Sequence, residues 1–146
     1  AVQTEDQGER FYRQAADAAS EGEARALFTF LADEEVQHRR IFQGLSDAIV
    51  VTEIDPTTWQ EALEYINAAV ASQFFGDEGA IRAVAEGATT VEMLERAIDF
   101  ERETLLFFFT LRDLVKPANR DLVERIIAEE KGHIRQLAAM IEAERA

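Results

Sequence analysis

The stretch ADEEVQHRRI, residues 32–41, contains one of only two histidines in the chain. His38 follows Glu35 by three residues, in the middle of a segment with helical periodicity. The second histidine, His133, follows Glu130 at the same distance in AEEKGHIRQL. Residues three apart lie on one face of a helix, so each Glu-x-x-His pair can direct both side chains to one point. In both segments that face is also the apolar one, which should point to a protein core.

Helix-forming residues dominate the rest of the sequence as well. Ala, Glu, Leu, Arg and Gln fill most positions, with only seven glycines and two prolines among 146 residues. The period-two alternation that indicates strands is nearly absent. A chain of this length fits one domain that can bury a sizeable core. We therefore expect a single all-α domain over residues 1–146.

Capping signals and periodicity predict the first two of four main helices. The first runs from about Thr4 to Ala19. The second opens in SEGE, where Ser20 and Glu23 form a capping box, and it continues to about Gly44, because a glycine can end a helix.

The third predicted helix starts at another capping box, Thr89 with Glu92, and stops before KPANRD. Pro117 is tolerated in the first turn of a helix, so the fourth helix begins there. The long segment 46–88 contains TTWQEALEYINAAVASQFF, whose periodicity predicts a further helix. A connection of this length lets the second and third helices run parallel. These features predict a four-helix bundle: two antiparallel pairs joined by a long, partly helical crossover.

Polar residues interrupt the apolar stripe at mid-length on all four main helices. They are Glu5, Glu35, His38, Glu101, Glu130 and His133. Four carboxylates in a low-dielectric interior cannot all stay ionised alone, because unpaired buried charges are costly and like charges raise one another's pKa. No Lys or Arg shares these stripes. Two divalent cations would balance the four negative charges, and carboxylate and imidazole ligands suit Fe, Mn or Zn better than Ca or Mg.

The same residues also allow a purely structural interpretation. Glutamate is common in this chain, so one Glu-x-x-His pair alone would fit an ordinary buried His–Glu contact. The chance occurrence of two such pairs on core stripes, together with a matching Glu on each of the other two helices, is improbable. Glu5 could instead be a first-turn acid that the helix dipole favours, and Glu9, one turn later, would then be the ligand candidate in its place. Tyr12 could donate to a site carboxylate or be ordinary core. Glu34 and Glu129 point about 100° away from the stripe, so we interpret them as solvated or as partners of the ligands.

Composition limits the partners of the protein. A formal charge of −14 and a pI near 4.5 argue against nucleic acid and anionic membranes as partners. No apolar run approaches the roughly 18 residues of a membrane span. The absence of cysteine excludes disulfides, thiolate zinc sites, iron–sulfur clusters and a cysteine nucleophile. The first residues have no basic start and no apolar stretch, so we expect no secretory signal there and a cytoplasmic location.

Four stretches, in order EDQGERFY, LADEEVQH, AIDFERETLLFF and IIAEEKGH, resemble the helix signatures of the rubrerythrin branch of the ferritin-like superfamily. The resemblance covers both helix pairs and implies a ferritin-like bundle that binds two irons. It leaves open which metal Glu35 and Glu130 would each hold. By this resemblance the ligands would be Glu5, Glu35, His38, Glu101, Glu130 and His133.

The chain also departs from the family pattern. Full rubrerythrins carry a rubredoxin-like iron centre held by four cysteines, so this chain would need an external electron donor for a peroxidase cycle. Thr104 stands where true rubrerythrins have an additional carboxylate. Val36 stands where bacterioferritin has its haem-binding methionine, so no haem is expected.

The resemblance implies a non-haem di-iron oxidase or peroxidase that reacts with O2 or H2O2, as a ferroxidase with Fe(II) as substrate or as a peroxide scavenger. It also implies a homo-oligomer, a dimer or larger. One alternative is an iron-sensing, storage or delivery module without turnover, which could be a fragment of a membrane iron transporter. The other is a metal-free structural bundle.

Overall fold

The computed structural model of the chain describes residues 2–19, 22–48 and 87–146, and every element in these ranges is an α-helix. In chain order the helices are α1 (Val2–Ala18), α2 (Glu23–Ala48), α5 (Thr90–Leu114) and α6 (Pro117–Arg145). The predicted helix in TTWQEALEYINAAVASQFF lies outside the described residues. None of the described helices is long and apolar enough to cross a membrane.

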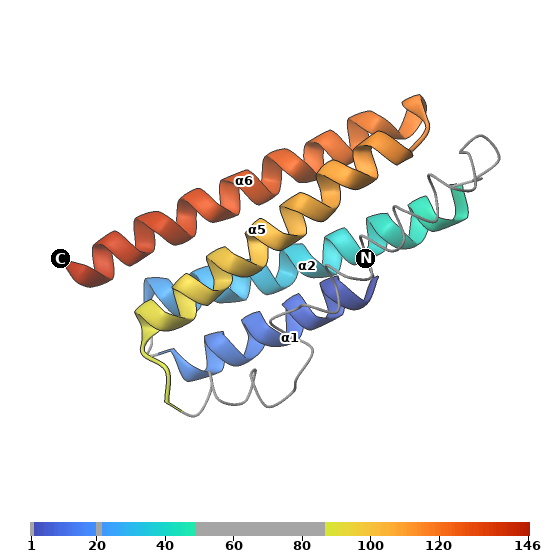
Figure 1. Cartoon of the computed structure of the whole chain (residues 1–146). Coiled ribbons are helices and arrows are strands. Elements are labelled where there is room, and N and C mark those ends of the chain that lie inside the picture. The colour runs from blue at the N-terminus through green and yellow to red at the C-terminus, as the bar shows by residue number, and fades with distance from the viewer. Residues whose placement is uncertain (1, 20–21, 49–86) are drawn as a thin grey trace.

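The four helices form two antiparallel pairs, α1 with α2 and α5 with α6 (Figure 1). The pairs meet through α2 against α6 and through α1 against α5. The second and third of these helices, α2 and α5, run in the same direction, as the long connection between them predicted (Figure 1). The predicted all-α bundle is confirmed.

Local sequence signals fix the junction between α5 and the preceding chain and the turn into α6. At the start of α5 the Thr89 hydroxyl accepts from the Glu92 N–H at 3.2 Å, and the Glu92 carboxylate accepts from the Thr89 N–H at 2.8 Å. Pro117 occupies the first turn of α6, where its missing N–H costs no hydrogen bond. Both predicted helix starts are confirmed.

The predicted end of α2 at Gly44 is wrong, because the helix continues to Ala48. Gly44 is exposed, and a glycine inside a helix costs only about 1 kcal/mol relative to alanine. Glycine ends a helix where the chain turns to positive φ, and among the described glycines only Gly22, before α2, has one. The start of α2 is at Glu23, but Ser20 of the predicted capping box lies outside the described residues.

The apolar core divides into two clusters along the bundle axis. One packs large side chains such as Tyr12, Phe28 and Leu31 against the first half of α5 and the last part of α6. The other joins the second half of α5 to the first part of α6, around Phe108 and Ile126. The buried polar residues lie between these clusters on both α5 and α6, so the bundle encloses a polar centre between two apolar ends.

Gly8 allows α1 to approach the polar centre closely. A Cβ atom at this position would lie 2.5 Å from Cζ of Phe100 and 3.0 Å from Cδ of Glu35. Phe100 is 2% exposed and its ring packs edge-on against Tyr12, so it has little room to move.

We therefore expect Gly8→Ala to destabilise the protein by about 1–3 kcal/mol through overpacking, despite the better helix propensity of alanine. Gly132→Ala is the matched control, because no heavy atom lies within 4 Å of its added Cβ, and it should gain up to about 1 kcal/mol. Urea unfolding of both variants measures the difference. Equal stability of the two would contradict the close packing at Gly8.

Candidate metal centre

Six polar side chains meet at the centre of the bundle, and none is more than 4% exposed. α1 and α5 each contribute one glutamate, whereas α2 and α6 each contribute a glutamate and the histidine three residues later. The structure thus brings together all the residues that interrupted the apolar stripes: Glu5, Glu35, His38, Glu101, Glu130 and His133.

The six residues form two groups of three. In the group of Glu5, Glu35 and His38, and in that of Glu101, Glu130 and His133, one ligand atom from each residue lies within 4.8 Å of the others. Ions bound at about 2.0–2.2 Å from their ligands fit such spacings. Both groups are buried and both contain two carboxylates and one imidazole, so each matches the donor set of a divalent transition metal.

Glu130 connects the two groups. Its Oε1 lies 3.0 Å from Nδ1 of His38, and its Oε2 makes a hydrogen bond of 2.9 Å with Nδ1 of His133. The two imidazole rings stack at a centroid distance of 6.1 Å. One carboxylate thus lies between two inward-facing imidazoles.

Several buried atoms of this centre have no hydrogen-bond partner within the protein. The contact between His38 Nδ1 and Glu130 Oε1 is short but not aligned as a hydrogen bond. Each buried polar atom without a partner costs about 1–3 kcal/mol, so they are rare in folded proteins. No Lys or Arg is among the buried residues of the described part of the chain. Bound cations would satisfy these atoms, which are Glu5 Oε1 and Oε2, Glu35 Oε2, His38 Nδ1, Glu101 Oε2 and Glu130 Oε1.

Burial makes three of the four carboxyl groups poor acids in the absence of metal. It raises the pKa of Glu5, and it raises the pKa of Glu35 well above its usual value, with the neighbouring Glu5 adding to the effect. Burial and the charge of Glu130 raise the pKa of Glu101 to about 8. Glu101 therefore holds its proton at neutral pH unless a cation replaces it.

At Glu130 and the two histidines, the neighbouring groups outweigh burial and shift the pKa towards the charged form. Burial alone would raise the pKa of Glu130, but its contacts with Glu101 and with both imidazoles lower it below its ordinary value. Burial alone would lower the pKa of the imidazoles. The close carboxylate of Glu130 raises the pKa of His38 to about 9, and the carboxylates of Glu101 and Glu130 raise that of His133 to about 10. Without metal, the centre is thus an ionised Glu130 between two protonated imidazoles.

The sequence model of the rubrerythrin family matches residues 1–141. The chain belongs to the rubrerythrin family. Comparison with curated proteins and with solved structures finds no match. The family match spans all four described helices, and the two buried Glu/His groups are consistent with the dinuclear metal site typical of rubrerythrins.

Tyr12 combines the two roles that the sequence left open. Its ring is fully buried and packs against Phe11, Phe28 and Phe100. Its hydroxyl donates a hydrogen bond of 2.5 Å to Oε1 of Glu101. Tyr12 is therefore both part of the apolar core and the direct partner of a carboxylate at the candidate metal centre.

Glu9, the substitute considered for Glu5, lies outside the centre. It accepts a hydrogen bond of 2.8 Å from Nη1 of Arg39, on the partly exposed face between α1 and α2. Glu5 is fully buried and lies in a candidate metal group. Of these two acids, the structure therefore gives only Glu5 the position of a ligand.

Thr104 is the position at which the resemblance implies an additional carboxylate in true rubrerythrins. Its side chain is 1% exposed and its hydroxyl has no hydrogen-bond partner. The hydroxyls of Thr29 and Thr110, by contrast, donate to the carbonyl oxygens four residues earlier, as helical threonines often do. The position thus has a buried hydroxyl instead of a further negative charge, which leaves the centre with four carboxylates.

Of the two roles that the sequence left open for Glu34 and Glu129, the structure favours that of partners of the proposed ligands. Oε2 of Glu129 lies 3.2 Å from Nε2 of His38, and Oε2 of Glu34 lies 3.9 Å from Nε2 of His133. Each acid thus approaches the histidine of the facing helix, which a single-helix projection cannot indicate. The signal in the sequence was the repeated Glu-Glu-x-x-His pattern, in which an acid directly precedes each inner glutamate.

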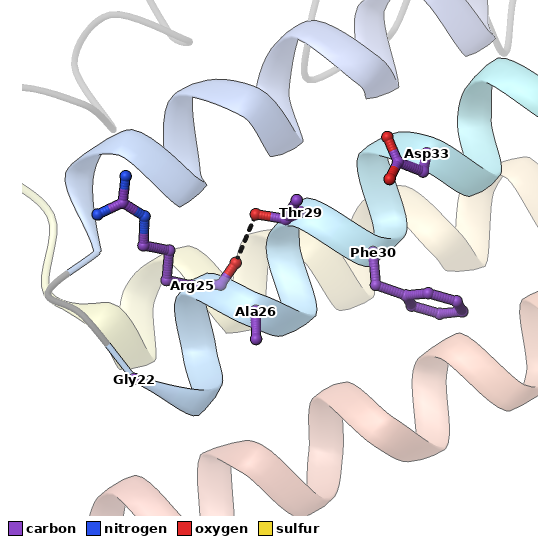
Figure 2. A pocket seen from close by; sticks show the side chains of 6 residues that line it. All are labelled: Gly22, Arg25, Ala26, Thr29, Phe30 and Asp33. Carbon is purple, nitrogen blue, oxygen red and sulfur yellow. Dashed lines mark hydrogen bonds between the residues drawn. The ribbon is translucent and has the colours of Figure 1, made fainter.

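A surface hollow lies along the first half of α2 and Gly22 just before it (Figure 2). The aromatic ring of Phe30 extends from α2 towards the facing helix and is 44% exposed (Figure 2). The same ring meets the imidazole of His133 edge-on, at a centroid distance of 6.0 Å. Phe30 therefore covers His133 on the side of the hollow, which is lined by Gly22, Arg25, Ala26, Thr29, Phe30 and Asp33.

The pKa shifts predict how the stability of the metal-free protein depends on pH. The folded chain binds protons more tightly than the unfolded chain at Glu101 (about 8 against 4.5) and at His38 and His133 (about 9 and 10 against 6.5). The free energy of unfolding should therefore fall as the pH rises from about 6 to about 9, because the folded state must lose protons that the unfolded state has already lost.

Thermal unfolding midpoints of chelator-treated protein across this pH range measure the effect. Protein loaded with a divalent metal should not show the fall, since the ligands are already deprotonated. A metal-free midpoint that stays constant or rises between about pH 6 and 9 would contradict the proposed protonation of the centre.

Proposed function

We propose that this protein is a di-iron oxidoreductase that uses O2 or H2O2 as its oxidant. The observation that carries the proposal is the pair of buried groups, each with two carboxylates and one imidazole, in a rubrerythrin-family bundle. Four carboxylate charges equal the charge of two divalent ions. The unpartnered ligand atoms support the same conclusion, because coordination would satisfy them.

Glu5, Glu35 and His38 would hold one iron, and Glu101, Glu130 and His133 would hold the other. Two bound Fe(II) ions would supply the electrons that reduce the oxidant. Mn or Zn would also fit this donor set.

The side chains around the ions have separate roles in this proposal. Glu130 faces both imidazoles, so its negative charge would act on the ligands of both ions. The Tyr12 hydroxyl holds Glu101 in position through its hydrogen bond. The two apolar clusters and the ring of Phe30 exclude bulk water from the centre, which strengthens electrostatic interactions inside it.

An iron-binding module that stores, senses or delivers iron without turnover is the second candidate. These 146 residues contain no cysteine, so they hold no thiolate iron centre that could return electrons to the di-iron site. An oxidase or peroxidase cycle would need an electron donor from outside the chain. Assembly into a dimer or larger oligomer and a cytoplasmic location stay predictions from the sequence.

Removing one buried carboxylate tests metal binding. Glu35→Leu should lower the iron content from two ions per chain to one or none, as measured by elemental analysis after loading with Fe(II). The metal-free variant should be more stable than metal-free wild type by about 1–4 kcal/mol, because a buried polar cluster loses a member that only metal satisfies. Glu144→Ala, on an exposed part of α6, is the control for charge removal. Unchanged iron content in Glu35→Leu would rule out the proposed site.

Turnover distinguishes the two candidate functions. With an added reductant, the iron-loaded protein should consume H2O2 or O2 over many cycles, and Glu35→Leu should be no faster than the same iron in protein-free buffer. Oxygen-electrode and peroxide assays measure this difference. Binding of two irons followed by a single oxidation, with no further consumption, would instead support the storage or delivery module.

A further inference from the structure

The acid that directly precedes each Glu-x-x-His pair approaches the histidine of the other helix pair. Glu129 of α6 places Oε2 3.2 Å from Nε2 of His38 on α2, within hydrogen-bonding distance. Glu34 of α2 places Oε2 3.9 Å from Nε2 of His133 on α6, which is too far for a hydrogen bond. Both halves of the bundle therefore place an acid near the opposite histidine, but only Glu129 and His38 are close enough for a hydrogen bond.

Both histidines turn the same nitrogen to the centre. Nδ1 of His38 and Nδ1 of His133 lie 3.0 Å and 2.9 Å from the two oxygens of Glu130, respectively. A neutral imidazole has one N–H and one lone pair, and only the nitrogen with the lone pair can bind a metal. An acceptor at Nε2 therefore selects the form of the ring that offers Nδ1 to an ion.

We propose that Glu129 is a positioning residue for the metal centre. Its carboxylate accepts a hydrogen bond from the Nε2–H of His38, fixes the ring orientation and keeps the proton away from Nδ1. The proposal rests on the proposed metal site, and it adds a residue that touches no metal itself. Glu34 has the equivalent position at His133, but its distance predicts a weaker contribution.

The surroundings of the two histidines support this difference. The His38 ring packs edge-on against Phe108, which is fully buried, and its outer nitrogen ends on Glu129. The His133 ring packs against Phe30, which is 44% exposed beside the surface hollow. The His38 ring is therefore fixed by its packing against Phe108 and by the contact of Nε2 with Glu129. The His133 ring is fixed mainly by the contact of Nδ1 with Glu130.

Glu34, His38 and Glu129 could also be considered as ligands of a third ion, since one atom from each lies within 4.8 Å of the others. A neutral His38 has only one lone pair, and Nδ1 already faces the inner group. An outer ion at Nε2 would therefore compete with an inner ion at Nδ1. The geometry favours hydrogen bonding at Nε2, and the third ion becomes an outcome of the test.

Zinc titration of the full chain tests the proposal without redox chemistry. Wild type should bind two zinc ions in competition with a chromophoric chelator. Glu129→Ala should lower the affinity for one of these zinc ions by about 10–100-fold. Glu129→Gln should recover part of that affinity, because its amide oxygen can still accept the hydrogen bond from Nε2–H. Glu34→Ala should lose less zinc affinity than Glu129→Ala. Glu144→Ala removes an exposed acid on the same helix as Glu129 and should leave the zinc affinity unchanged.

Imidazole NMR gives a readout that loss of packing alone would not change. Because the chain has only two histidines, their ring signals can be assigned by single His→Gln variants. In zinc-loaded wild type, the His38 Nε2–H should exchange slowly with solvent and Nδ1 should be the zinc-bound nitrogen. In Glu129→Ala the Nε2–H should exchange quickly, while the circular dichroism of the helices stays unchanged.

Three results would overturn the proposal. The first is a zinc affinity of Glu129→Ala that lies within about twofold of the zinc affinity of Glu144→Ala, together with Nε2–H exchange at His38 that is as slow as in wild type. The second is a third zinc ion in wild type that Glu129→Ala alone removes, which would make Glu129 a ligand. The third is wild type that binds no zinc or iron, which would remove the proposed metal site together with this inference.

Discussion

The structure depends on how four carboxylates can be neutralised inside a bundle that is otherwise apolar. Glu5, Glu35, Glu101 and Glu130 are all nearly inaccessible to solvent, and the buried part of the described chain offers no Lys or Arg to pair with them. Two imidazoles and a tyrosine hydroxyl are the main polar partners within the protein. Protons can neutralise this set, as the raised pKa of Glu101 indicates, but they leave several ligand atoms without partners. Two divalent ions would satisfy both charge and coordination, which is why the metal proposal follows from the interior.

The rest of the fold supports this centre. Apolar clusters at both ends of the polar region exclude water and supply the burial energy that stabilises the bundle. The close approach at Gly8 lets α1 bring its glutamate to the centre beside Glu35. Each helix pair provides one glutamate from one helix and a Glu-x-x-His pair from the other, so neither pair can form the whole centre alone. Each pair supplies one of the two metal groups, and packing of the two pairs brings the groups together.

The two halves of the centre are similar but not equivalent. Tyr12 holds Glu101, Glu129 lies within hydrogen-bonding distance of His38, and the corresponding contact of Glu34 with His133 is longer. The surface hollow lies on the His133 side, where Phe30 forms the cover. Metal ions in such halves would differ in how firmly they are held. That difference provides a physical basis for distinct behaviour of the two ions, whether the protein turns over an oxidant or stores iron.

The sequence by itself determined the helical class, the capped start of α5, the proline start of α6 and the six polar residues of the centre. Periodicity of 3.6 residues assigns every residue to a face of its own helix, and the apolar stripe marks the face that must be buried. The predicted end of α2, placed at Gly44 because a glycine can end a helix, was wrong, since Gly44 does not turn the chain to positive φ and α2 continues to Ala48. Only the tertiary structure decided that Tyr12 reaches Glu101 and that Glu34 and Glu129 approach the opposite histidines. These contacts depend on the separation and rotation of neighbouring helices, which side-chain packing between segments far apart in the chain sets and no local pattern records.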